Sequence, residues 1–151
     1  MTSRTALVLT VFIQLLGLGL SHAQSSNVIG SWRVEITFGN GDSRSLRFEA
    51  RESAKGSFLL LDPRLKVWGP ARPSEAKWTQ GDDGSVMFSG TVEFPLGNVG
   101  RDAGTLVLKG KVGTEGTITG AAIFFPLDQD PKDPKARPSK SGSFKAIRVT
   151  G

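Results

Sequence analysis

The sequence contains no cysteine and no tyrosine, and its one histidine is His22. Histidine is the commonest general base, cysteine is a strong nucleophile, and all three residue types can hold a haem iron. Beyond residue 22 the chain therefore excludes Ser-His or Cys-His catalysis, a zinc site with these ligands and a haem held by them. Carboxylate and lysine chemistry remain open, since two carboxylates suffice for glycoside hydrolysis. No phosphate-binding loop, dinucleotide fingerprint or GxSxG sequence is present, so we expect a non-enzymatic protein without metal or cofactor.

Residues 1–23 have the layout of a cleaved secretory signal. One arginine precedes an uncharged apolar run over residues 6–20, and Ser21 and Ala23 are the small residues that a signal peptidase reads. A retained membrane anchor is the alternative, but a spanning helix needs about 20 apolar residues and this run is shorter. We therefore expect cleavage after Ala23 and a secreted or periplasmic protein made of residues 24–151.

The chain is mildly basic, with a formal net charge of +5. Its cations are interleaved with carboxylates, as in Arg33 and Glu35 or Arg47 and Glu49. A nucleic-acid-binding surface usually needs a basic block with aromatic residues among the cations. No such block is present, so we expect no nucleic-acid partner.

Apolar and polar residues alternate through most of the chain after the signal, which is typical of strands with one buried face. In the first run four apolar residues share one face: Trp32, Val34, Ile36 and Phe38. Turn-forming residues separate eight runs, at 32–38, 46–51, 57–61, 75–80, 85–94, 105–112, 116–125 and 143–149. The longer connections are expected at 62–74, 95–103 and 126–141.

Eight strands joined mostly by short turns suit an antiparallel up-and-down barrel, because closure leaves no exposed sheet edge. We therefore predict an all-β fold with one β-barrel domain over residues 24–151, and a β-sandwich is the alternative. An outer-membrane barrel would need strands of about 9–11 residues and aromatic girdles. Several runs are shorter than this, so we expect no membrane insertion once the signal is removed.

Two short signatures lie at opposite ends of this domain. Gly30-Ser31-Trp32 opens the first strand, and Arg148 shares a strand face with Phe144 near the other end. A Gly-x-Trp at the first strand of a small exported barrel resembles the calycin superfamily, which includes lipocalins, fatty-acid-binding proteins and avidin-like proteins. The resemblance implies that Trp32 packs at the closed end of the barrel and that Arg148 lies across it as a cation–π pair. A ligand-contacting Trp32 in an open mouth is the alternative.

The chain departs from the calycin pattern in two ways. Lipocalins place a helix before their final segment, but residues 126–141 hold four prolines and cannot sustain one. No avidin-like set of polar ligand residues aligns with this chain. The resemblance therefore implies a fold more than a ligand.

Inward-facing aromatic residues suggest that the barrel holds a small apolar ligand. The candidates on strands are Trp78, Phe88, Phe94 and Phe124. The alternative is a filled core, because small barrels have interiors just wide enough for side chains. Trp68 lies in the 62–74 loop, where it would act as a lid or a partner anchor, or would fold back over the barrel end.

A protein partner is the alternative to a small ligand. Bacterial metalloprotease inhibitors share a small barrel of this kind, which is compatible with an envelope interaction domain or inhibitor-like protein. Binding would then use the loops 62–74 and 126–141. In the 95–103 loop, Arg101 could bind an anion together with backbone N–H groups, or could be held by pairing with Asp102.

Overall fold

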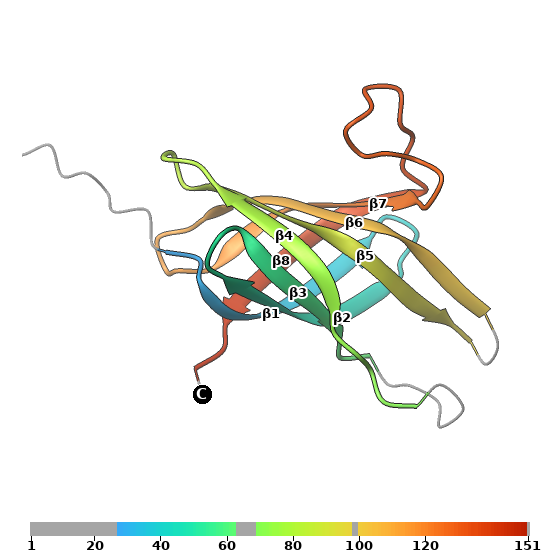
Figure 1. The fold of residues 1–151 in the computed structure, drawn as a ribbon, viewed down its shortest axis with the longest axis horizontal. Coiled ribbons are helices and arrows are strands. Elements are labelled where there is room, and N and C mark those ends of the chain that lie inside the picture. Colours follow the sequence, from blue (N-terminus) through green and yellow to red (C-terminus); the bar gives the residue numbers. More distant parts are fainter. Residues whose placement is uncertain (1–26, 63–68, 98–99, 151) are drawn as a thin grey trace, which may run out of the picture.

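The computed structural model describes residues 27–62, 69–97 and 100–150. Over these residues eight antiparallel strands follow one another around a closed barrel, in which β1 also pairs with β8 (Figure 1). The strands are β1 (Gly30–Phe38), β2 (Ser43–Arg51), β3 (Lys55–Leu60), β4 (Ser74–Gln80), β5 (Ser85–Leu96), β6 (Gly100–Val112), β7 (Ile118–Pro126) and β8 (Lys140–Arg148). The predicted all-β up-and-down barrel is confirmed, and the sandwich alternative is wrong.

Alternate side chains of each strand point into the barrel and form one hydrophobic core. In β1 the four residues from Trp32 to Phe38 that share a face are all buried, as the alternation predicts. Each such side chain removed from water stabilises the fold by about 1.5–3 kcal/mol. The described part of the chain contains no helix, and hence none that is long and apolar enough to span a membrane.

The barrel has two dissimilar ends, which lie to the left and right of Figure 1. The tryptophan end is formed by residues 27–29, by the turns 52–54, 81–84 and 113–117, and by residues 149–150. The loop end is formed by the turn 39–42, the described parts of the connection 61–73, and the connection 127–139. The first and last described residues, Asn27 and Thr150, therefore lie at the tryptophan end.

The expected loop at 95–103 is wrong in extent. β5 runs to Leu96 and β6 begins at Gly100, and Pro95 pairs with Arg101 within their ladder. Proline cannot donate a ladder hydrogen bond, so it is tolerated where a strand has a neighbour on one side only. The expected loop at 126–141 is also shorter, because β8 already begins at Lys140.

Pairing around the barrel is incomplete beside β4. β3 pairs with β4 only from Lys55 to Phe58, and β4 pairs with β5 only from Val86 to Gly90. Among the described residues, the remaining half of β5 from residue 91 to 96 has a ladder partner only on β6. The wall of the barrel is therefore parted on one side near the loop end.

Candidate functional site

At the tryptophan end residues 27–29 and Arg148 close the barrel. The guanidinium carbon of Arg148 lies 4.4 Å from the ring centroid of Trp32. Arg148 also donates to the carbonyl oxygens of Ile29, at 2.8 Å, and Asn27, at 2.6 Å. The Trp32 indole N–H donates to the carbonyl of Val28 at 2.8 Å. Trp32 is thus held by Arg148 over its ring and by the hydrogen bond of its indole N–H, and it is fully buried and does not line an open mouth.

At the loop end Lys140 lies across the interior. Its side chain is 11% exposed, and its Nζ lies 2.8 Å from Oδ2 of Asp102. The same Nζ lies 5.0 Å from the ring centroid of Phe38, 5.5 Å from Phe94 and 5.1 Å from Phe124. A cation over three ring faces, with a carboxylate beside it, satisfies its charge while covering the aromatic layer below.

Arg44 covers the same layer from β2. Its guanidinium carbon lies 5.1 Å from the ring centroid of Phe94, and its Nη1 lies 3.7 Å from Oδ2 of Asp62. Asp62 is oriented by the backbone N–H of Ser45, which donates to its Oδ1 at 2.9 Å. The buried Nε of Arg44 and Oδ2 of Asp62 have no hydrogen-bond partner among the described residues. Two cations therefore stand between the apolar interior and solvent at this end.

The four predicted ligand-binding aromatics on strands are spread along the barrel. Phe94 and Phe124 touch at the loop end, with centroids 5.3 Å apart, and Phe88 stacks on Phe48 at 4.0 Å. Trp78 packs against the core near the tryptophan end, where its indole N–H donates to the carbonyls of Arg51 and Lys55 at 2.8 and 2.9 Å.

None of these four residues lines either of the two cavities described below. Their role in ligand binding stays a prediction, and the predicted lid residue Trp68 lies outside the described residues.

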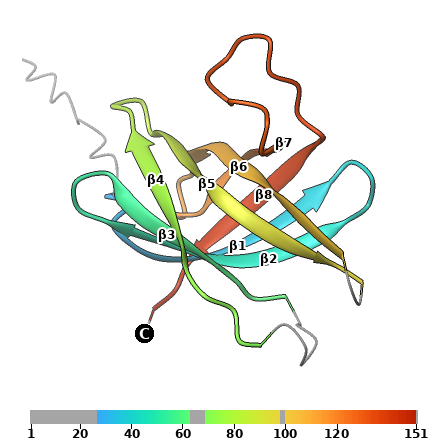
Figure 2. The same ribbon diagram turned by 45° about the vertical axis from the view of Figure 1, so that its right-hand side comes forward.

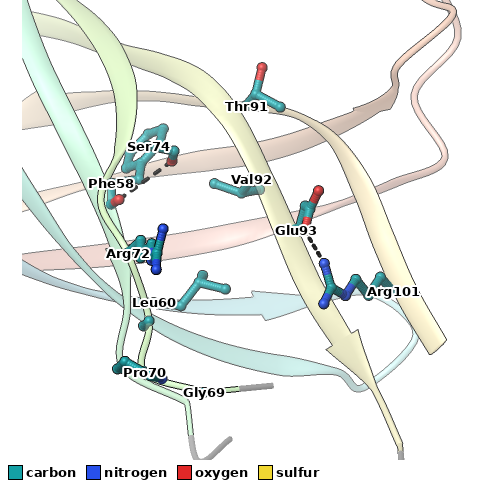
Figure 3. A pocket seen from close by; sticks show the side chains of 11 residues that line it. Phe58, Leu60, Gly69, Pro70, Arg72, Ser74, Thr91, Val92, Glu93 and Arg101 are labelled. Atoms are coloured by element: carbon teal, nitrogen blue, oxygen red, sulfur yellow. Dashed lines mark hydrogen bonds and ion pairs between the residues drawn. The ribbon is translucent and has the colours of Figure 1, made fainter. Parts of the chain in front are cut away.

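The parted wall of the barrel forms a cavity of about 450 Å³, here called the side cleft (Figure 3). Its apolar side is formed by Phe58 and Leu60 of β3 and by Val92 of β5. All three stand in the inward rows of their strands, and they face one another across the gap. The side cleft thus reaches inward-pointing side chains through the wall, although Phe58 and Val92 are themselves only 1% and 3% exposed.

Polar groups surround this apolar side. Residues 69–72 pass along one edge and bring Arg72 to the cleft, and the hydroxyl of Ser74 donates to the carbonyl of Phe58 at 3.4 Å. On the opposite edge, Nη1 of Arg101 lies 3.0 Å from Oε2 of Glu93, and both side chains are about half exposed.

The expected pairing of Arg101 with Asp102 is wrong. Arg101 pairs with Glu93, whereas Asp102 pairs with Lys140 because neighbouring residues of a strand point to opposite faces.

The carboxyl groups with a shifted pKa lie away from the side cleft. The two carboxyls with a lowered pKa, Glu35 and Asp83, lie elsewhere, and each is held chiefly by a serine hydroxyl, from Ser45 and Ser85 respectively. Among the described residues, no three histidine, cysteine, aspartate or glutamate side chains gather as a metal site would require. What the cleft offers is an apolar surface with hydrogen-bonding groups at its rim.

No family model matches the chain, and no curated protein matches it significantly. The closed eight-stranded antiparallel barrel is consistent with a calycin-like architecture. Residue roles must therefore be argued from this chain's own geometry.

Sequence reasoning missed the three apolar residues of the side cleft. Phe58, Leu60 and Val92 follow the same alternation as any core position, so the sequence offers no local signal that sets them apart. What distinguishes them is that the second half of β5, from residue 91 to 96, does not pair with β4. The prolines and glycine of residues 69–73 indicated the loop at its edge but not the cavity beside it.

Proposed function

We propose that the protein is an exported, non-enzymatic, calycin-like binding protein that holds a small ligand in the side cleft. Export rests on the signal-like residues 1–23. The observation that carries the proposal is that Phe58, Leu60 and Val92 line a cavity of about 450 Å³ in the wall of the barrel. Ligand sites usually have volumes of about 300–1,000 Å³ and combine apolar walls with a few polar groups.

The lining indicates the chemistry of the ligand. An apolar body would lie against Phe58, Leu60 and Val92, and a hydrogen-bonding group would face Arg72 and Ser74 at the rim. Because both ends of the barrel are covered by cations over aromatic rings, entry from the side requires less rearrangement than entry along the axis.

A filling substitution tests this site. In Leu60→Trp a larger side chain occupies the cleft, whereas Leu59→Trp places the same bulk on a neighbouring residue that does not line it. Protein purified from its own host is examined by native mass spectrometry and thermal shift. We expect a bound small molecule in the wild type and in Leu59→Trp, and its loss in Leu60→Trp. Wild-type protein that is always empty, or a ligand that survives Leu60→Trp, would contradict the proposal.

A second candidate function is supported by the second half of β5, which pairs with a neighbouring strand on one side only. A strand with unpaired backbone groups can accept an extended segment of a partner protein. Residues 91–96 have a ladder partner only on β6 among the described residues. Residues 91–93 line the side cleft together with residues 69–72, which belong to the predicted binding loop 62–74. The other predicted binding loop, 126–141, lies at the same end of the barrel.

Hydrogen exchange on a captured complex tests the partner-strand alternative. The protein is used as bait in periplasmic extract or culture fluid, and amide exchange is compared between the complex and the free protein. Strand addition predicts slower exchange in residues 91–96, with little change at 105–112. Protection confined to the outer face of β1 and β2 would reject it.

A further inference from the structure

A second cavity lies on the outside of the barrel, away from the apolar wall of the side cleft. This outer groove has a volume of about 640 Å³ and crosses the outer faces of β5, β6 and β7. Lys55 and Lys77 stand on one side of it, and Asp130 to Lys132 of the β7–β8 connection stand on the other. In Figure 2 this connection rises beyond β6 and β7, across from β4. Among the described residues, the two cavities share only Thr91 at their margins.

The floor of the outer groove is apolar although it faces away from the core. Val107, Ile123 and Phe125 stand in the outward rows of β6 and β7, where Val107 lies directly opposite Ile123 and Phe125 lies opposite Thr105. Val107 is 4% exposed and Phe125 is 8% exposed, so the floor is recessed below the surrounding side chains. Outward strand positions of a soluble barrel are normally polar, and a contiguous apolar strip there marks a binding surface.

The wall formed by the β7–β8 connection is internally braced. The backbone N–H of Lys132 donates to Oδ1 of Asp130 at 2.9 Å, and that of Asp133 donates to the Asp130 carbonyl at 2.9 Å. Further along, the N–H of Arg137 donates to the side-chain oxygen of Gln129 at 3.1 Å. The wall is thus built without a ligand, which lowers the ordering cost of binding.

The rim of the outer groove is strongly basic. Five cations border it, against the carboxylates Glu75 and Asp130: Arg51, Lys55, Lys77, Lys109 and Lys132. None of the five forms an ion pair with another described residue. An occupant of this groove must therefore place negative charge near the rim and apolar surface on the floor.

We propose that the outer groove binds single molecules of an anionic amphiphile, with the apolar chain along Val107, Ile123 and Phe125 and the acidic head at the lysines. The volume lies within the range of small-ligand sites. The recessed floor fits one chain entering the groove and is out of reach of a flat membrane surface. This site is independent of the function proposed for the side cleft, because its floor and charges belong to the outer face.

The charge preference is tested with three probes of equal chain length. Decane-1-sulfonate, decyltrimethylammonium and decyl maltoside are titrated below their micellar concentrations into the isotope-labelled secreted protein, and amide resonances are followed by NMR. We expect saturable shifts at Val107, Ile123, Phe125 and Lys132 with the sulfonate, at several-fold lower concentration than with the other two. Equal binding of all three, or sulfonate shifts centred on Phe58, Leu60 and Val92, would overturn the proposal.

Two matched pairs of variants separate the groove from general surface effects. Lys132→Glu should weaken sulfonate binding by about three- to tenfold, because attraction at the rim becomes repulsion. Lys135→Glu changes the same charge in the same connection but outside the groove, and should change binding less than twofold. Ile123→Ser on the floor should weaken binding, whereas Ile147→Ser on the exposed face of β8 should not. Equal effects within either pair would refute the assigned site, and neither Lys132→Glu nor Ile123→Ser should release a ligand from the side cleft.

Discussion

A single glycine makes the arrangement around Trp32 sterically feasible. Gly30 has a φ of +132°, in a region that other residues rarely adopt, and an ideal Cβ on it would lie 2.7 Å from Nη1 of Arg148. That same Nη1 donates to the carbonyl of Ile29. The glycine of the Gly-x-Trp signature therefore leaves room for the guanidinium that covers the tryptophan.

Gly30→Ala is predicted to lower the free energy of unfolding by about 1–3 kcal/mol, through backbone strain and the contact with Arg148. Urea unfolding followed by fluorescence measures the change. Gly39→Ala is the control, because its φ lies outside that region and its ideal Cβ meets its nearest atom, the Ser141 carbonyl oxygen, at 3.5 Å. Equal losses in the two variants would show that Gly30 has no special role.

At the scale of elements, the outer face of β1 and β2 carries a hydrogen-bonded group centred on the Glu35 carboxylate. Glu35 lies opposite Ser45, whose hydroxyl donates to Oε2, and Arg33 donates to Oε1 at 2.8 Å. The Ser45 hydrogen bond is the largest influence on Glu35 and lowers its pKa below the ordinary value of 4.5; burial opposes this less strongly, and Arg33 lowers the pKa further. The folded protein therefore releases this proton more readily than the unfolded chain.

This pairing predicts a pH-dependent contribution to stability. Because the folded pKa is lowered, the contribution is fully present above about pH 4.5 and is lost as pH falls through the folded pKa. Half of the Glu35 side chain is exposed, so the effect should be below about 1 kcal/mol. Urea unfolding between pH 3 and 6 should give a flatter curve for Glu35→Gln than for the wild type, with Glu49→Gln as the control. Parallel curves for the wild type and Glu35→Gln would disprove the linkage.

At the scale of the whole molecule, the barrel is covered at both ends by cations over aromatic rings. Arg148 lies over Trp32 at one end, and Lys140 and Arg44 lie over Phe94 at the other. At the loop end these contacts combine ring attraction with charge pairing to Asp102 and Asp62 at a partly desolvated position. The apolar interior is therefore closed at both ends of the barrel axis. The side cleft opens through the barrel wall, and the outer groove lies on the outer surface of that wall.

Lys140→Met tests whether the charge itself matters at the loop end. Methionine keeps most of the packing volume but removes the cation from the rings and from Asp102, so we expect a loss of about 1–2 kcal/mol in the free energy of unfolding. Lys145→Met, on the exposed face of the same strand, should change it by less than about 0.5 kcal/mol. A Lys140→Met protein as stable as the wild type would assign this end to packing alone.

Most of the barrel could be predicted from the alternation of residues, and much of the candidate site could not. The pattern correctly predicted the inward side of β1 and placed Arg148 on the strand face of Phe144. It predicted a loop near residues 69–72 but not the cavity at its edge. The strand ends at Leu96 and Gly100 were missed, because Pro95 and the glycines around it indicate a loop unless β6 is already in place beside them.

The sequence by itself determined the number of strands, the face of each that turns inward, and the absence of histidine, cysteine and tyrosine chemistry beyond residue 22. Only the tertiary structure decided that residues 91–96 lack a partner on β4 and that outward Val107 and Phe125 are recessed beneath a basic rim. A two-residue period in the sequence indicates which side chains of a strand face the core. The curvature of the barrel and residues distant in the chain decide which strand lacks a neighbour. They also decide which segment covers the outer face of a strand.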